Sequence, residues 1–238
     1  MIAPIGLLLL AAVNSTTTQP TAAEVVQRMV QADGRRSTSY RGYTGMRRYA
    51  LQNKHFDVRA EALVRVVCTG AGVKSFHVLS ETGSHLIGDR VIRKMIEGEA
   101  EASRTGEHEQ NRIVPKNYDF RLLGTEVAEG RLNYVLEIFP KTSYRFLLRG
   151  RIWVDAEEYA ITKVAGSPAK NPSFWIRDVE IVLRYSKTGP FWLPLRNESR
   201  ANARILGKTE LTIDYFDYVL NGQNNSQAPS ARPTAKPE

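Results

Sequence analysis

Apolar and polar residues alternate over much of the chain, in short segments that are separated by turn residues. Between residues 176 and 185, for example, Val179, Ile181 and Leu183 fall on one face and mostly charged residues on the other. A period of two is typical of a strand with one buried face. The pattern predicts strands over residues 40–51, 56–68, 73–79, 132–139, 151–155, 160–164, 176–185, 191–194, 197–206 and 208–220, with a further strand beginning at Tyr118.

A period of 3.6 replaces this alternation in two places. Thr21 and Glu24 form a capping box, in which each side chain accepts a hydrogen bond from a free amide at a helix start. Apolar residues then recur at helical spacing as far as Val30, and Gly34 is a typical helix C-cap. A first helix is therefore predicted from Thr21 to Gly34.

A second helix is predicted to begin near Ser84. Apolar residues from Ile87 to Ile96, including Ile92 and Met95, form one stripe on a helix of about four turns. Residues 97–110 are acidic and have little periodicity, so they are interpreted as a loop or a frayed helical end.

Short strands joined by turns, with no alternation of strands and long helices, indicate an antiparallel sheet. Turns are predicted at residues 69–72, 129–130, 156–158 and 187–190. Two amphipathic helices need an apolar surface to cover. The predicted fold class is mainly β (α+β): a curved antiparallel half-barrel with helices on its concave face. One domain is expected over residues 19–220, followed by a disordered tail over residues 221–238 that is rich in Asn, Gln, Ser, Pro and Ala.

The N-terminal residues suggest export. Residues 5–13 are apolar, too few to span a bilayer and typical of a signal peptide, although no Lys or Arg precedes them. A signal peptide is predicted over residues 1–18. Cys68 is the only cysteine, so no lipid-bearing cysteine follows this segment and no disulfide forms. We expect an exported, soluble protein without a lipid anchor, in which Cys68 is a buried small apolar residue.

The chain has a net charge of +8 and a pI of about 9.6. A basic balance fits nucleic acid, an anionic membrane surface or an acidic partner. Here the basic residues are spread along the chain; the densest group is Arg47 and Arg48, with Arg35, Arg36 and Arg41 upstream. This spread is interpreted as a solvated surface. It disfavours nucleic acid and leaves room for transient contact with a membrane surface.

No motif for catalysis, nucleotide binding or metal binding is present. The four histidines, His55, His77, His85 and His108, lack metal-ligand spacing, and no nucleotide loop or nucleophile elbow occurs. Asp155 is a candidate acid or base, but its place before a turn favours turn initiation.

The neighbouring Glu157 and Glu158 are predicted to be solvated, because they fall in the same turn. With no nucleophile, base and orienting group together, we expect no enzyme activity, no cofactor and no metal.

Aromatic residues lie at strand ends and turns: Trp153, Phe174, Trp175, Phe191 and Trp192. They fit two interpretations, as fillers of the core or as the lining and rim of an apolar cavity.

Several segments resemble the outer-membrane lipoprotein-sorting proteins, the LolA-like group that also includes LolB-like and RseB-like sensor folds. The resemblance covers roughly residues 20–220 as a diffuse pattern. It is carried by residues 117–120, 134–140, 150–155, 159–163, 166, 168–175 and 191–194. It implies a half-open antiparallel barrel with helices as a lid and an apolar cavity for acyl chains.

The resemblance implies a soluble periplasmic carrier that binds acyl chains of lipoproteins or other lipids and delivers them towards the outer membrane. Its partners are then the lipid cargo and membrane-bound donor and acceptor proteins, and we expect a monomer. The alternative is a periplasmic sensor or regulator of the same fold, which binds lipid or misfolded protein and signals to a membrane partner. A lipid-modifying enzyme and a scaffold without ligand are further alternatives.

Candidate cavity-lining residues come from strand alternation and the helix stripe, since the family's pocket residues have no clear counterparts here. Because strand register is not readable from the sequence, some of them are expected to face the other side. They are Ile92, Met95, Ile96, Leu136, Ile138, Trp153, Val179, Ile181, Leu183, Leu211 and Ile213.

Overall fold

The computed structural model describes residues 19–53, 58–83, 88–105, 108–144, 146–170, 176–203 and 207–222. The predicted signal peptide and residues 223–238 of the predicted tail lie outside the described residues, as do His55, His85, Phe174 and Trp175. The described part contains the helices α1 (Ala22–Ser39), α2 (Gly88–Thr105) and α3 (His108–Asn111).

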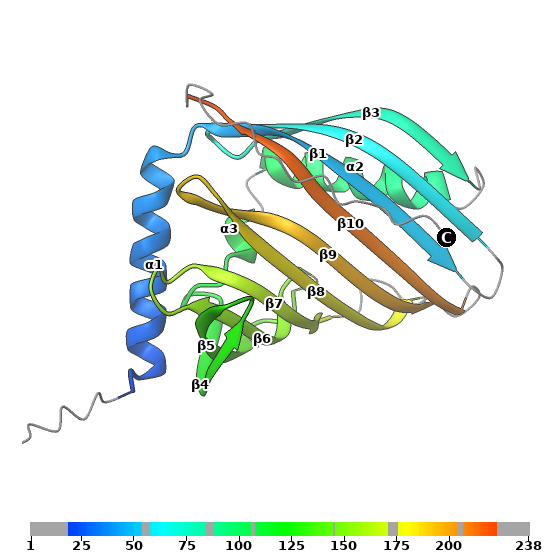
Figure 1. The fold of residues 1–238 in the computed structure, drawn as a ribbon. Helices are drawn as coiled ribbons and strands as arrows, with labels where there is room; N and C mark the ends of the chain where they lie inside the picture. The colour runs from blue at the N-terminus through cyan, green and yellow to red at the C-terminus, as the bar shows by residue number, and fades with distance from the viewer. Residues whose placement is uncertain are drawn as a thin grey trace, which may run out of the picture.

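The strands form one antiparallel sheet of ten strands in the order β3-β2-β1-β10-β9-β8-β7-β6-β5-β4 (Figure 1). Their bounds are β1 (Gly42–Asn53), β2 (Val58–Thr69), β3 (Lys74–Gly83), β4 (Tyr118–Ala128), β5 (Arg131–Pro140), β6 (Leu148–Asp155), β7 (Ile161–Pro168), β8 (Ile176–Thr188), β9 (Phe191–Ala203) and β10 (Gly207–Leu220). Each strand pairs with the next strand in the sequence, except that β3 and β4 do not pair and form the two edges of the sheet. Strand β10 pairs with β1, so the first and last strands lie side by side.

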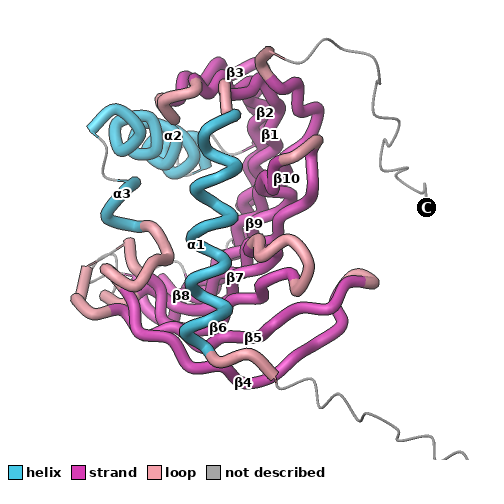
Figure 2. Tube along the Cα trace, turned by 90° about the vertical axis from the view of Figure 1, so that its left-hand side faces the viewer, coloured by secondary structure: helices cyan, strands magenta, loops and turns pink. Residues whose placement is uncertain are grey.

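The sheet is strongly curved, and the helices lie on its concave side (Figure 2). The two end strands, β3 and β4, do not meet, so the barrel stays open. This arrangement confirms the predicted mainly-β half-barrel with helices over its concave face. The sheet curves because each strand pair twists, and the twist accumulates over many strands.

Helix α1 begins at the predicted capping box. The backbone N–H of Glu24 donates to Thr21 Oγ1, and Glu24 Oε2 accepts from the backbone N–H of Thr21 at 2.7 Å. The predicted end at Gly34 is wrong, because the helix continues to Ser39. The φ angle of Gly34 is not positive, so the backbone at this position does not require a glycine.

Helix α2 is longer than predicted. Its described part runs to Thr105, and a short α3 follows. Of the two interpretations of residues 97–110, a loop is wrong for most of the segment, and a helical end is correct as far as Thr105. Ile92, Ile96, Ala100 and Ser103 are buried on one face, which carries the apolar stripe into the acidic segment with smaller residues. The sequence pattern failed there because alanine and serine do not register as strongly apolar.

The turns agree with the predictions at residues 70–71, 129–130, 156–158 and 189–190. The two predicted strands over 191–194 and 197–206 form one strand, β9, which runs through Pro194. A register shift in the β8–β9 pairing, between Arg184 and Tyr185, lies beside this proline and absorbs the irregularity that it causes.

Two apolar clusters occupy the concave side. The α1 cluster lies at the β4–β7 end of the sheet and contains Val25, Val26, Met29, Tyr118, Leu136, Ile138, Leu147, Ile152, Val154 and Val164. The α2 cluster lies at the β1–β3 end and contains Tyr43, Tyr49, Leu51, Ala60, Ala62, Val64, Val66, Cys68, Ile92, Ile96, Phe191, Leu193, Leu211, Ile213, Tyr215 and Leu220. Cys68 is buried, as predicted.

A pair of glycines brings β6 and β7 into close contact. Gly150 and Gly166 are paired across the two strands, and a Cβ atom on Gly150 would lie 2.1 Å from the carbonyl oxygen of Ala165. No side chain fits at this point. The two strands therefore approach closely beside the α1 cluster, to which both contribute.

Candidate functional site

A cavity of about 550 Å³ lies between α1, the segment of residues 111–114 and the concave side of the sheet. Cavities of roughly 300–1,000 Å³ are typical of small-molecule sites. Its walls are formed by Met29, Val30, Asp33, Arg36, Ser37, Tyr40, Asn111, Arg112, Ile113, Val114, Ala160, Ile161, Tyr185, Phe191, Trp192 and Leu193.

The walls of this cavity are mainly apolar, and the charged groups lie towards solvent. Asp33 on α1 and Arg112 form an ion pair at 2.7 Å, and both side chains are more than one third exposed. Tyr185 on β8 faces the interior, where burial raises its pKa to about 12, so its hydroxyl stays protonated at neutral pH. An apolar interior with a charged rim suits an amphiphilic molecule better than a polar one.

A second cavity of about 380 Å³ adjoins the first, beneath α2. Tyr40 and Asn111 line both cavities. The ring of Tyr40 packs edge-to-face on Phe191 at a centroid distance of 5.3 Å, and its hydroxyl donates to Cys68 Sγ at 3.3 Å. Tyr40 therefore stands between the two cavities.

Three charged residues form a partly buried ion cluster beneath α2. Glu99 on α2 accepts from both terminal nitrogens of Arg47 on β1, at 2.7 and 3.2 Å. The same carboxylate accepts from Lys74 Nζ on β3 at 2.6 Å. The Arg47 side chain is only 3% exposed and lies against the rings of Phe76 and Tyr215. The prediction that the basic residues are solvated is wrong for Arg47.

Burial would lower the pKa of Arg47 and of Lys74, but the nearby Glu99 carboxylate outweighs burial and raises both pKa values. Both side chains therefore stay charged at neutral pH. The ion cluster links α2 to the sheet by charge-assisted hydrogen bonds, which are stronger than neutral ones.

Acid is expected to weaken this link through Glu99. Burial alone would raise the pKa of Glu99, but Lys74 and Arg47 lower it to about 2. In an unfolded chain the pKa of a glutamate side chain is about 4.3. The stabilisation by the ionised Glu99 is therefore complete above that pH and is lost as the pH falls towards about 2. From this group we expect the free energy of unfolding to fall by on the order of 1 kcal/mol, measured by urea unfolding over that pH interval.

The control for this acid effect lies on the same helix. Glu99→Gln should reduce the dependence of the unfolding free energy on pH, since it removes one of the titrating groups. Glu97→Gln changes an exposed carboxylate nearby and should keep the wild-type dependence. An equal acid dependence in the wild type and in Glu99→Gln would contradict the prediction.

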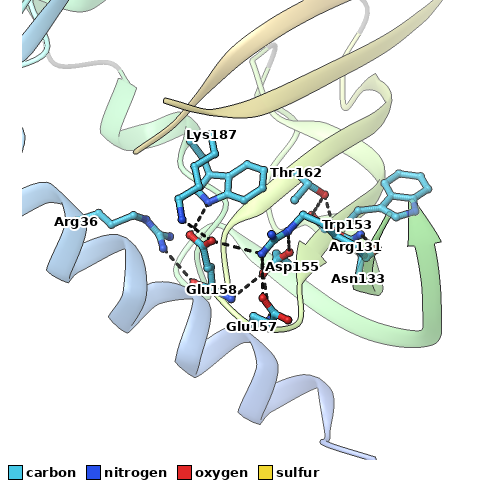
Figure 3. A network of polar contacts seen from close by, with 10 residues as sticks. Arg36, Arg131, Asn133, Trp153, Asp155, Glu157, Glu158, Thr162 and Lys187 are labelled. Atoms are coloured by element: carbon cyan, nitrogen blue, oxygen red, sulfur yellow. Dashed lines mark hydrogen bonds and ion pairs between the residues drawn. The ribbon is translucent and has the colours of Figure 1, made fainter. Parts of the chain in front are cut away.

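A polar network joins α1 to two hairpins at the rim of the larger cavity (Figure 3). Arg36 on α1 donates to the carbonyl oxygen of Glu158 at 3.0 Å. The Glu158 carboxylate accepts from Lys187 Nζ at 2.7 Å and from Trp192 Nε1 at 3.0 Å. Burial would raise the pKa of Glu158, but these two donors outweigh it and lower the pKa. Glu158 is 25% exposed and paired with these donors, so the prediction that it is solvated holds only in part.

Asp155 holds the turn that carries Glu158. Its carboxylate accepts from the backbone N–H groups of Glu157 and Glu158 at 3.0 and 2.7 Å, and from Arg131 Nε at 2.5 Å. The predicted turn-initiating role of Asp155 is confirmed. Glu157 is exposed, as predicted.

The structure divides the predicted lining residues between the two clusters and the middle of the sheet. Ile92, Ile96, Leu211 and Ile213 belong to the α2 cluster, and Leu136 and Ile138 belong to the α1 cluster, with Leu183 packed against it. Val179 and Ile181 are half-buried on β8, on the same face as Leu183. Met95 lies on an exposed part of α2.

Trp153 faces the opposite side of the sheet. It is paired with Val135, while its neighbours Ile152 and Val154 belong to the α1 cluster. Its indole N–H donates to Glu126, and Lys163 lies over its ring at 4.0 Å. None of the eleven predicted residues is among those that form the two cavities described above. Cavity lining by these residues stays a prediction that a ligand complex can test.

Some of the residues that form the cavities lie where sequence patterns are uninformative. Residues 112–114 are irregular, and Tyr40 lies between α1 and β1. Phe191 and Trp192 are the exception, because aromatic residues at strand ends were one of the signals for a cavity lining. The structure shows both at the larger cavity.

Within the described ranges, no group of three or more His, Cys, Asp or Glu residues is arranged to hold a metal ion. No helix among those residues is long and apolar enough to cross a membrane.

No family model matches this chain, and no curated protein matches it. Solved structures with a similar fold include a DUF1329 family protein from Desulfovibrio piger, with a TM-score of 0.44 and 13% identity over 87% of this chain and 97% of that chain. An outer-membrane lipoprotein-sorting protein domain from Vibrio parahaemolyticus has a TM-score of 0.43 and 12% identity over 86% and 95%. A LolA superfamily protein from Nitrosomonas europaea has a TM-score of 0.38 and 12% identity over 87% and 96%. The last two come from the group that the sequence segments resemble.

Proposed function

We propose that the protein is a soluble periplasmic carrier that binds the acyl chains of lipoproteins or other lipids between α1 and the sheet. It delivers them towards the outer membrane, from a membrane-bound donor to a membrane-bound acceptor, and it is not an enzyme. The observation that carries this proposal is the mainly apolar cavity of about 550 Å³ between α1, residues 111–114 and the sheet. The apolar segment of residues 5–13 supports export.

An acyl chain gains about 0.8 kcal/mol for each methylene that leaves water, so even a modest apolar cavity retains a lipid tail. A carrier must also release its cargo, which requires a wall that moves at low cost. The C-terminal half of α1 meets its surroundings largely through polar contacts, such as the Asp33–Arg112 ion pair and the bond from Arg36 to Glu158. Exposed pairs of this kind contribute about 0–1 kcal/mol each. This half of α1 is suited to act as a movable lid.

The proposed site can be tested by a substitution on α1 that places a large side chain in the cavity. Ser37 lines the cavity from an exposed position on α1, and its hydroxyl donates to the Gly34 carbonyl oxygen. Ser37→Trp places an indole ring at the cavity mouth. We expect binding of a fluorescent acyl probe to weaken about tenfold, which corresponds to about 1.4 kcal/mol. Fluorescence titration measures the dissociation constant.

Ser39→Trp is the matched control. Ser39 is also exposed near the end of α1, and its hydroxyl donates to Arg36 in the same way, but it does not line the cavity. It should leave probe binding and thermal stability unchanged. Equal probe affinity in both variants, with both folded, would contradict the proposed location of the site.

Native mass spectrometry of the protein, purified without detergent from the envelope of its own host, identifies the cargo class. A bound lipid or lipopeptide of discrete mass supports the carrier. A mass without ligand, together with no uptake of an added acylated peptide, favours the alternative of a sensor that binds a protein partner.

A further inference from the structure

We infer that the smaller cavity beneath α2 binds the anionic group of the cargo, a carboxylate or a phosphate, while the acyl chain occupies the larger cavity. This inference rests on the proposed function, because it assigns the polar end of the same ligand. The two cavities share Tyr40 and Asn111, so one amphiphilic molecule can extend from one into the other.

The charge of the ion cluster points to an anion. Two cations, Arg47 and Lys74, face one carboxylate, Glu99, which leaves one positive charge in excess. Among the described residues, no other carboxylate lies within ion-pair distance of either cation. A partly buried charge in excess is costly unless an anion comes close.

Lys74 is the residue best placed to meet such a ligand. It lines the smaller cavity, and its side chain is 28% exposed. Its ammonium group has three protons, and Glu99 Oε1 accepts one of them. Arg47, by contrast, is fixed between two aromatic rings and directs its donors to Glu99 and to the hydroxyl of Tyr49.

Lys74 has polar neighbours on α2, at the wall of the smaller cavity. Ser103 on α2 accepts from the backbone N–H of Lys74 at 3.0 Å and donates to the carbonyl oxygen of Ala100 at 2.7 Å, so it fixes the cavity wall. Lys74, Glu99 and Ser103 therefore lie together on the wall of the smaller cavity beneath α2.

The experiment compares ligands that share one chain and differ in the headgroup. The full chain is loaded with a neutral fluorescent acyl probe, which is then displaced by dodecanoate, dodecyl phosphate, dodecanol or inorganic phosphate. We expect the two anionic amphiphiles to bind about tenfold more tightly than the alcohol, as for one charge-assisted hydrogen bond. Comparison of dodecanoate with dodecyl phosphate also distinguishes a carboxylate headgroup from a phosphate headgroup.

Two variants move this preference in opposite directions. Lys74→Gln removes the excess charge and should lower the ratio of anion affinity to alcohol affinity about tenfold. Glu99→Gln removes the competing carboxylate and should raise that ratio. A merely structural role of the ion cluster would give losses in both variants. Lys94→Gln, on an exposed position of α2, makes the same charge change as Lys74→Gln and should leave the ratio as in the wild type.

The outcomes separate the two proposals. Equal affinity for dodecanoate, dodecyl phosphate and dodecanol would overturn the anion site and leave acyl binding intact. Displacement of the probe by inorganic phosphate alone would indicate a site with no need for a chain, and would also overturn the inference. If neither the probe nor any of the three amphiphiles binds, the proposed function itself fails.

Discussion

Val25→Asp is expected to detach α1 from the sheet and to abolish binding of an acyl probe. Val25 is fully buried in the α1 cluster, where it packs among apolar side chains. Burial of an unpaired charge is among the most destabilising changes known. We expect the free energy of unfolding to fall by about 3 kcal/mol or more, which lowers the melting temperature by roughly 10 °C in a domain of this size.

Loss of function should accompany this loss of stability, because α1 supplies one wall of the larger cavity, from Met29 to Ser37. Below its melting temperature, the variant is expected to keep its sheet, measured by far-ultraviolet circular dichroism, and to lose probe binding by more than about tenfold. Detachment of α1 would remove one wall of the cavity and leave the wall formed by the sheet in place. Gln27→Asp adds the same charge to an exposed position of α1 and serves as the control. Probe binding by folded Val25→Asp at wild-type affinity would show that α1 is not part of the site.

Asp155→Ala is expected to cost about 3 kcal/mol of stability, because a nearly buried carboxylate with several donors is removed. Its side chain is only 1% exposed, and it accepts from Arg131 and from the backbone N–H groups of Glu157 and Glu158. Alanine leaves both backbone donors without their partner. Thermal and urea unfolding measure the loss.

Two companion variants identify the cause. Asp155→Asn keeps one oxygen for the backbone donors and loses the ion pair with Arg131, so about half of the loss is expected. Glu157→Ala changes a neighbour that is 84% exposed and should be near neutral. If Asp155→Ala were as stable as Glu157→Ala, the carboxylate would not hold the turn. Because that turn carries Glu158, Asp155→Ala should also weaken the contact of α1 with the cavity rim.

The local elements were predictable because each depends on neighbours in the sequence. The capping box of Thr21 and Glu24 needs only residues three apart, and it formed as predicted. The alternation of Leu211 and Ile213 with polar neighbours identified the buried face of β10. The turns followed from their own residues. Antiparallel order and helices on one side then followed from short connections and from apolar helix faces that must be covered.

Strand register and faces were harder to predict. Trp153 is an aromatic residue at a strand end, which is typical of a cavity lining. Its side chain nevertheless faces the side of the sheet opposite to Ile152 and Val154. A shift of one residue in strand register reverses the face of every side chain, and the sequence of a single strand does not fix it. Most of the other predicted residues pack within the two clusters, where they fill the core and do not border the two cavities.

The sequence by itself determined the fold class, the helix start at Thr21, the turns and the apolar faces, because these depend on short-range patterns. Only the tertiary structure decided which charges are buried and where the cavities lie. Arg47 resembles any surface arginine until Glu99, Phe76 and Tyr215, from three other elements, surround it. Such contacts join residues far apart in the chain, so their energies depend on a packing arrangement that no local pattern contains.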